Sequence, residues 1–139
     1  MVKEDPVDVK EIWPSGGYIN FYIELPVRKN SQTAHLINLV QEETTEGYAF
    51  RLTHNAYGET REAYPDEEFN IAGGYVSFPI NTVIQENETK LKVEWTWYKT
   101  YGVITSKETE TKGVEGTYKK GGFEHMPKGT AMKTMAVIR

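Results

Sequence analysis

The sequence predicts an all-β protein, an antiparallel, immunoglobulin-like β-sandwich of about seven to nine strands. Short segments in which apolar and polar residues alternate recur along the chain, as expected of strands that place one face on a core. No segment carries a sustained apolar stripe with the 3.6-residue period of a helix. Gly-Gly followed by an aromatic residue occurs three times, at 16–18, 73–75 and 121–123, where glycine allows a turn and the aromatic residue opens a strand. A closed β-barrel is the alternative that these patterns leave open.

The segments expected to form strands are, in chain order, 7–12, 18–25, 33–41, 47–54, 75–80, 90–98, 103–111, 114–120 and 132–138. The alternation is clear at 18–25, where one face is apolar throughout. That face is made by Ile19, Phe21, Ile23 and Leu25. Tyr22 points to the opposite side of this strand, and we expect it to be exposed.

The middle of the chain continues the pattern with two irregularities. Segment 33–41 is apolar but does not alternate, so it is either a strand buried on both faces or a strand with a bulge. Segments 47–54 and 75–80 alternate regularly. Pro79 lacks an N–H and places the second of these strands at an edge or a break. Segment 80–88 is the one helix candidate, of about one turn, and its β-branched residues weaken it.

Segment 90–98 has the strongest period-two pattern in the chain. Its apolar face is made by Leu91, Val93, Trp95 and Trp97. The shared face with two aliphatic residues predicts that Trp95 is buried, and Trp97 less completely because it lies nearer the strand end. Tyr98 lies on the opposite, polar face, and Tyr101 follows in the turn. Both tyrosines are therefore predicted to be available for contact with another molecule.

Length and composition predict one domain, residues 1–139, in the cytoplasm. The chain has no cysteine, which excludes disulfides, thiolate metal sites and thiol catalysis and fits a reducing compartment. The N-terminus has no apolar stretch of the kind found in signal peptides, and no long apolar run occurs elsewhere. We therefore expect neither a signal peptide nor a membrane partner.

Charge is unevenly distributed along the chain. Residues 1–111 carry 10 Lys/Arg and 18 Asp/Glu, a net −8, whereas the basic C-terminal segment 112–139 carries 6 and 2, a net +4. An acidic body argues against general nucleic-acid binding, which favours a basic surface. The opposite charges are compatible with head-to-tail contact between copies or with a solvated, lysine-rich tail.

No motif of catalysis or of metal binding is present. The chain lacks phosphate-binding loops, nucleophile elbows and short histidine ligand spacings. His35 and His54 fall in neighbouring expected strands, where they could face each other as packing residues or, less simply, as metal ligands. The acidic runs at 42–43 and 65–68 have the pattern of solvated loop charge. We expect no catalytic residue, metal or cofactor.

These observations favour a non-enzymatic protein-interaction or assembly module. Its partner would be another protein or a second copy, bound through an edge strand and exposed aromatic residues. The candidate contact residues are Tyr22, Trp97, Tyr98 and Tyr101. The alternative is a carbohydrate- or small-ligand-binding β-domain that uses the last three of these residues and takes a glycan as ligand. An enzyme of unrecognised type is the third hypothesis.

Residues 47–97 resemble the major sperm protein family. The order GYAFRLTHNA, a proline-containing loop, IAGGYVSFPI, a charged turn and KLKVEWTW is similar to the order in that family, mainly through Val93-Glu94-Trp95. The resemblance implies an immunoglobulin-like sandwich. It further implies a cytoskeletal or scaffold domain that binds copies of itself or a related filament.

Overall fold

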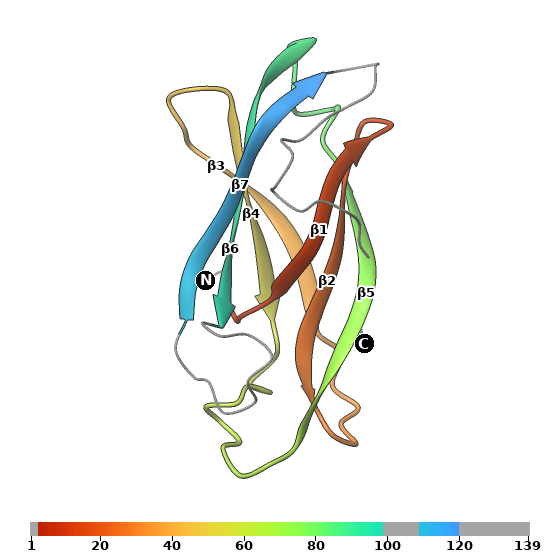
Figure 1. Cartoon of the computed structure of the whole chain (residues 1–139), viewed down its shortest axis with the longest axis vertical. Coiled ribbons are helices and arrows are strands. Elements are labelled where there is room, and N and C mark those ends of the chain that lie inside the picture. Colours follow the sequence, from red (N-terminus) through yellow and green to blue (C-terminus); the bar gives the residue numbers. More distant parts are fainter. Residues whose placement is uncertain (1–2, 99–108, 120–139) are drawn as a thin grey trace.

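The computed structural model describes residues 3–98 and 109–119, which form two packed antiparallel-rich sheets (Figure 1). The strands are β1 (Asp8–Ser15), β2 (Tyr18–Arg28), β3 (Leu36–Glu42), β4 (Tyr48–Asn55), β5 (Phe69–Pro79), β6 (Glu88–Tyr98) and β7 (Thr109–Lys119). One sheet has the order β1-β2-β5 and the other the order β3-β4-β6-β7. Within residues 3–98 and 109–119 the two sheets share no strand pairing, so the predicted sandwich is confirmed and the closed barrel is not.

The core lies between the sheets and is built by the residues that the alternation places inward. Phe21, Ile23 and Leu25 of β2 are completely buried. In β6, Val93 is completely buried and Trp95 is 5% exposed. Burial of an aromatic or large aliphatic side chain contributes about 1.5–3 kcal/mol to folding. The predicted inward faces of these two strands are therefore confirmed.

One strand pairing departs from the predicted antiparallel arrangement. β4 and β6 pair in parallel, from Tyr48 opposite Leu91 to Arg51 opposite Glu94. Beyond this point the N-terminal segment lies between them. The Asp5 N–H donates to the carbonyl of His54 on β4 at 2.9 Å. The N–H of Val7 donates to the carbonyl of Thr96 on β6 at 2.9 Å, so residues 5–7 replace the missing ladder.

Several strand boundaries differ from the sequence-based expectation. β5 begins at Phe69 and not at residue 75, because its pairing with β2 continues to Arg28. Residues 109–119 form one strand where two were expected, and segment 132–138 lies outside the described residues. The helix candidate at 80–88 is a single turn closed by the Ile84 N–H on the Ile80 carbonyl at 2.9 Å. In the described ranges, 3–98 and 109–119, no helix is long and apolar enough to cross a membrane.

The glycine pairs have different roles. Gly16 and Gly17 form the two-residue turn between β1 and β2, with φ values of 61° and 84° that suit a type I′ hairpin. Gly73 and Gly74 instead lie inside β5, so the prediction of a turn there was wrong. A Cβ on Gly73 would lie 2.5 Å from the hydroxyl oxygen of Tyr22, so this glycine makes room for that ring. The third pair lies outside the described residues.

Candidate functional site

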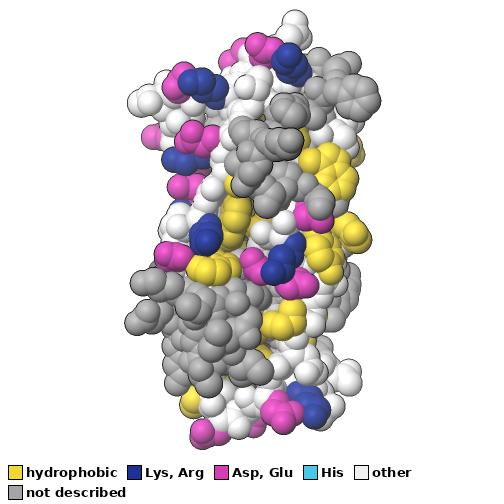
Figure 2. All heavy atoms as spheres, in the orientation of Figure 1, with side chains coloured by type: hydrophobic (Ala, Val, Ile, Leu, Met, Phe, Trp, Pro, Cys, Tyr) yellow, Lys and Arg dark blue, Asp and Glu magenta, His cyan; other side chains and the backbone are white. Residues whose placement is uncertain are grey.

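The outer face of the β1-β2-β5 sheet carries three tyrosines, which we call the tyrosine face: Tyr18, Tyr22 and Tyr75. Tyr22 and Tyr75 are directly opposite each other in the pairing of β2 with β5, and their ring centroids lie 5.0 Å apart at a tilt of 42°. Tyr75 is 61% exposed and Tyr18 is 45% exposed, whereas Tyr22 is half-buried. In Figure 2, large hydrophobic side chains gather on the right, on the side of β1, β2 and β5 in Figure 1.

A row of hydrogen-bonded polar groups crosses the tyrosine face. Asn20 lies between Trp13 of β1 and Ser77 of β5 in the strand register. Its amide donates to the Trp13 carbonyl at 2.9 Å and to the Ser15 hydroxyl at 3.1 Å, and its side-chain oxygen accepts from the Ser77 hydroxyl at 2.7 Å. These bonds hold three strands together beside the rings, so the tyrosines stand on a rigid surface.

The structure describes three of the four residues predicted as contacts, and it does not bring these three together on one exposed surface. Tyr22 lies on the tyrosine face, while Tyr101 lies outside the described residues. Trp97 is half-buried against the core, and the Lys112 ammonium lies 4.1 Å from its ring centroid. Trp97 therefore does not form an exposed aromatic platform, and the structure does not place it next to Tyr22.

Tyr98 is completely buried, so the prediction that it is exposed was wrong. The loop after β4 covers the polar face of β6 at this point. The Tyr98 hydroxyl donates to Glu62 Oε2 at 3.1 Å, and the Arg61 guanidinium lies 4.9 Å from the ring centroid. Burial, followed by the charge of the nearby Glu62, raises the pKa of Tyr98 well above its ordinary value.

Sequence reasoning missed Tyr18 and Tyr75, although a signal for both was present. The inward alternation of Val76 and Phe78 requires Tyr75 to point outward, and that of Ile19 requires the same of Tyr18. This signal was overlooked because residues 73–75 were interpreted as a turn. Tyr75 was read as the residue that opens a strand, whereas it lies in the middle of β5 opposite Tyr22.

A buried polar array joins the N-terminal segment, β4 and two loops. The expectation that His35 and His54 face each other is confirmed: their rings stack with centroids 5.0 Å apart, and His35 Nδ1 lies 2.8 Å from His54 Nε2. His54 Nδ1 contacts the Pro6 carbonyl at 2.8 Å, and His35 Nε2 contacts Glu59 Oε1 at 2.7 Å. The second Glu59 oxygen accepts from the Ser31 hydroxyl.

Hydrogen-bond accounting fixes the protons along this array. A carbonyl can only accept, so His54 Nδ1 carries a hydrogen and its Nε2 accepts from His35 Nδ1–H. One proton then lies between His35 Nε2 and Glu59. Burial lowers the pKa of His54 to about 4 and keeps this ring neutral near pH 7.

The carboxyl at the end of the array is held ionised. Burial alone would raise the pKa of Glu59, but the hydrogen bonds from Ser31, His35 and the Arg28 backbone hold it below its ordinary value. The side chains of Glu59, His35 and His54 are each 3% exposed or less. The array is therefore a structural clamp. Within residues 3–98 and 109–119, no group of three or more histidine, aspartate or glutamate side chains is placed to hold a metal.

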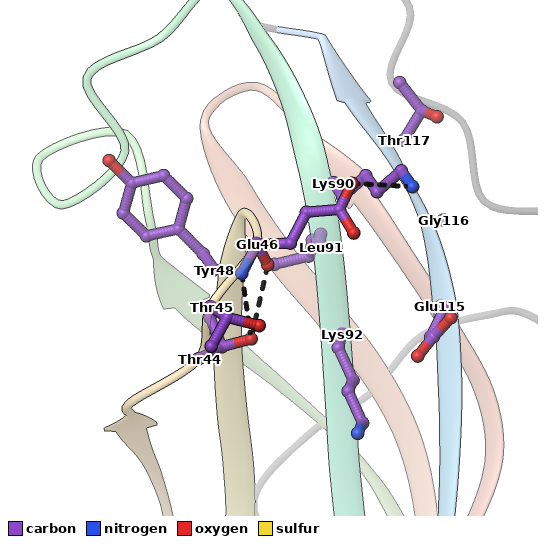
Figure 3. Close-up of a pocket in the computed structure, with 10 residues that line it drawn as sticks. All are labelled: Thr44, Thr45, Glu46, Tyr48, Lys90, Leu91, Lys92, Glu115, Gly116 and Thr117. Carbon is purple, nitrogen blue, oxygen red and sulfur yellow. Dashed lines mark hydrogen bonds and ion pairs between the residues drawn. The ribbon is translucent and has the colours of Figure 1, made fainter.

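A shallow hollow of about 360 Å³ lies at the other end of the four-stranded sheet (Figure 3). Figure 3 shows its lining residues, which come from the β3–β4 turn, β6 and β7. Lys90 pairs with Glu46 at 2.8 Å, and both side chains are about 70% exposed. The Tyr48 ring points away from the hollow, and its hydroxyl donates to Glu86 at 2.7 Å. Lys90 and Glu46 are solvated and paired with each other, and Leu91, the buried residue of the lining, is apolar, so the hollow offers no buried polar group for ligand recognition.

Comparison with known proteins identifies the relatives of this fold. Residues 1–111 match the family model described as "NigD-like C-terminal beta sandwich domain". No curated protein matches the chain. The predicted resemblance to major sperm proteins was wrong, because this family and its structural relatives account for the same residues. The cytoskeletal function that the resemblance implied falls with it.

Three solved structures share the fold. A NigD-like immunity protein from Bacteroides caccae is 24% identical, with a TM-score of 0.62 over 91% of this chain and 57% of that one. A putative toxin related protein from Parabacteroides distasonis is 23% identical, with a TM-score of 0.52 over 80% of this chain and 50% of that one. A protein of unknown function from Bacteroides vulgatus is 19% identical, with a TM-score of 0.51 over 96% of this chain and 54% of that one. The chain thus spans about half the length of these proteins.

Proposed function

The chain belongs to the family of NigD-like C-terminal β-sandwich domains, and from this membership and the tyrosine face we propose that it is a non-enzymatic module that binds a protein partner. The contact surface is the outer face of the β1-β2-β5 sheet, centred on the tilted ring pair of Tyr22 and Tyr75. This proposal retains Tyr22 from the predicted contact residues and adds two tyrosines that the structure places beside it.

The exposure of Tyr75 on a rigid sheet is the observation that carries the proposal. A tyrosine ring buries a large area on binding and loses little rotamer entropy, which is why tyrosine is enriched at protein interfaces. Tyr75 is 61% exposed and packs on Tyr22, whose own ring lies over Gly73. The pair is thus held in place before any partner arrives, and preorganisation lowers the entropic cost of binding.

The class of partner is supported by the structural relatives. One of them is described as an immunity protein and another as toxin related. Immunity against a protein toxin can be achieved by binding alone, which requires a surface and no catalytic group. The carboxylate–imidazole array of Glu59, His35 and His54 is buried, which agrees with a role without catalysis. We therefore include a toxin protein among the partners to be tested.

The experiment compares the wild-type chain with Tyr75→Ser. Each immobilised chain is exposed to extracts and culture media of Bacteroides caccae and Parabacteroides distasonis, and a captured protein is identified, purified and titrated. We expect Tyr75→Ser to weaken binding by about tenfold or more without changing the melting temperature. Light scattering over a concentration series tests a second copy as the partner. Monomeric behaviour together with no captured protein would refute the proposal.

Glycan binding by the same surface is the second candidate. The rings of the tyrosine face lie next to the polar row at Asn20 and Ser77, and an aromatic ring beside amide and hydroxyl groups suits stacking on a sugar. Titration with bacterial polysaccharides, followed by the emission of nearby Trp13, tests this candidate. A saturable change that Tyr75→Ser abolishes supports it, and unchanged emission at high glycan concentration argues against it.

A further inference from the structure

The turn that follows β4 holds a tyrosine in a backbone conformation that tyrosine rarely adopts. The Glu59 N–H donates to the Ala56 carbonyl at 3.1 Å, and the two central residues, Tyr57 and Gly58, have φ values of 52° and 83°. In the described residues, the only other non-glycine residue with positive φ is Asn30. Asparagine tolerates this region, whereas a bulky residue does so at an energetic cost. Such strain persists only where the surroundings impose it.

The surroundings of this turn do impose its shape. The Ala56 N–H donates to Asp5 Oδ2 at 2.8 Å, and the Tyr57 N–H donates to Asn55 Oδ1 at 2.8 Å. Glu59, at the end of the turn, is fixed by the buried array through His35. Hydrogen bonds therefore hold the turn on both sides. Two of the groups that hold it come from other segments: Asp5 from the N-terminal segment and His35 from the β2–β3 loop.

The strained side chain is presented to solvent. Tyr57 is 62% exposed, the highest value among the large hydrophobic side chains of the described ranges. Leu36, 52% exposed, pairs with Asn55 at the same end of the β3–β4 pair. In Figure 1 the loop after β4 extends beyond the end of the two sheets. Tyr57 and Leu36 are thus two exposed apolar side chains near the same end of β4, and we call them the apolar tip.

The loop that carries this tip is acidic. Residues 56–68 contain five carboxylates and one arginine, so the charge is 1 − 5 = −4. The five are Glu59, Glu62, Asp66, Glu67 and Glu68. Glu59 and Arg61 are buried, and the other four carboxylates are exposed. Two of these four lie near cations, Glu68 at 2.9 Å from Lys29 and Glu67 at 3.7 Å from Arg28. A partner that binds this end of the sandwich therefore meets an exposed aromatic ring on a loop of net negative charge.

We propose that Tyr57 is a preformed anchor that inserts into an apolar pocket, rimmed by basic residues, on a protein partner. The inference rests on the proposed function for the existence of that partner, but it uses a different surface. A protruding aromatic residue at the centre of a contact is a common binding hot spot. Because the turn is already fixed, its ordering cost is met on folding and not on binding. The strained backbone at Tyr57 reduces the stability of the fold, and it is retained because it holds the ring in position for the partner.

The test uses four full-length variants and the protein captured by the wild-type chain, purified and titrated in solution. Tyr57→Asn removes the ring and suits the positive φ, while Tyr57→Phe keeps the ring. Leu36→Ser removes the neighbouring apolar group, and Tyr75→Ser reports on the tyrosine face. We expect Tyr57→Asn to weaken binding by about 30-fold with an equal or higher melting temperature, and Tyr57→Phe to stay within about threefold. Leu36→Ser should fall between them. Raising the salt concentration should slow association.

The outcomes separate this inference from the proposed function. Loss of binding in both Tyr57→Asn and Tyr75→Ser supports both surfaces. Loss in Tyr57→Asn alone supports the anchor and refutes the tyrosine face. Wild-type affinity in Tyr57→Asn with loss in Tyr75→Ser refutes the anchor and leaves the proposed function standing. No binding by the wild-type chain refutes both, and a lower melting temperature in Tyr57→Asn refutes the strain on which the anchor is argued.

Discussion

Tyr75 and Tyr98 both point away from the core face of their strands, yet their environments are opposite. Each points away from the core face of its strand, in β5 and β6 respectively, and neither position is distinguished by the local alternation. Tyr75 is 61% exposed, whereas Tyr98 is completely buried under Arg61 and Glu62 of the loop after β4. The difference shows that an outward position in a strand predicts exposure only where no other segment covers that part of the sheet.

The largest loss of stability is expected when the covered ring of Tyr98 is removed. Tyr98→Ala deletes a completely buried aromatic side chain and leaves a cavity beneath the loop, so we expect a loss of about 3–5 kcal/mol in the free energy of unfolding. Tyr75→Ala is the matched control, with a loss within about 0.5 kcal/mol. Urea denaturation of both variants measures the two values. Equal losses would contradict the conclusion that the Tyr98 ring is covered by the loop and the Tyr75 ring is exposed to solvent.

Acid should weaken the clamp that holds the covering loop. The folded-state pKa of His54 is about 4 against an ordinary value of 6.5, so the unfolded chain binds this proton more readily. Stability that is present above pH 6.5 is therefore lost as the pH falls towards 4, by about 3 kcal/mol. The lowered pKa of Glu59 adds a loss in the same direction below its ordinary value. Urea midpoints measured from pH 7.5 to pH 4 test this, and a midpoint that does not fall contradicts the buried, neutral His54.

A smaller effect is expected from the hydroxyl of the covered ring. Tyr98→Phe removes the hydroxyl with its hydrogen bonds to the Glu62 carboxylate and to the Arg61 backbone, while the exposed Glu62 stays hydrated, so we expect a loss of about 1 kcal/mol at pH 7. Since the folded-state pKa of Tyr98 is raised, its contribution is complete below pH 10 and is lost as the pH rises above that value. Stability measured from pH 8 to pH 11 should fall less steeply in Tyr98→Phe than in the wild-type chain. Parallel curves would show that the ring does not titrate as described.

The smallest stability effect is expected on the tyrosine face itself. Tyr75→Ser changes an exposed side chain, so its melting temperature should stay within a few degrees of that of the wild-type chain. Differential scanning calorimetry measures this, and a large decrease would mean that Tyr75 supports the fold and not a partner. The same variant should show its effect in partner binding, as proposed above.

The resemblance to major sperm proteins failed for a reason that concerns sequence patterns in general. It rested on Val93-Glu94-Trp95, which are inward, outward and inward residues of a half-buried strand. Any β-sandwich strand with an aromatic core residue produces such a triplet, so it carries little information about family. The match over residues 1–111 includes β1 to β6 and the start of β7, and it identifies a different family.

The sequence by itself determined the all-β class, most of the strands and the inward faces of β2 and β6, because the period-two alternation is a local property of a strand. It also indicated that His35 and His54 could face each other, although His35 lies in the β2–β3 loop and not in a strand, and it did not indicate the Glu59 and Pro6 groups that complete their array. Only the tertiary structure decided which of the outward-pointing tyrosines are exposed to solvent. The group that bonds to Tyr98 is 36 residues away in the chain, and a contact at that separation arises from packing and not from any local pattern.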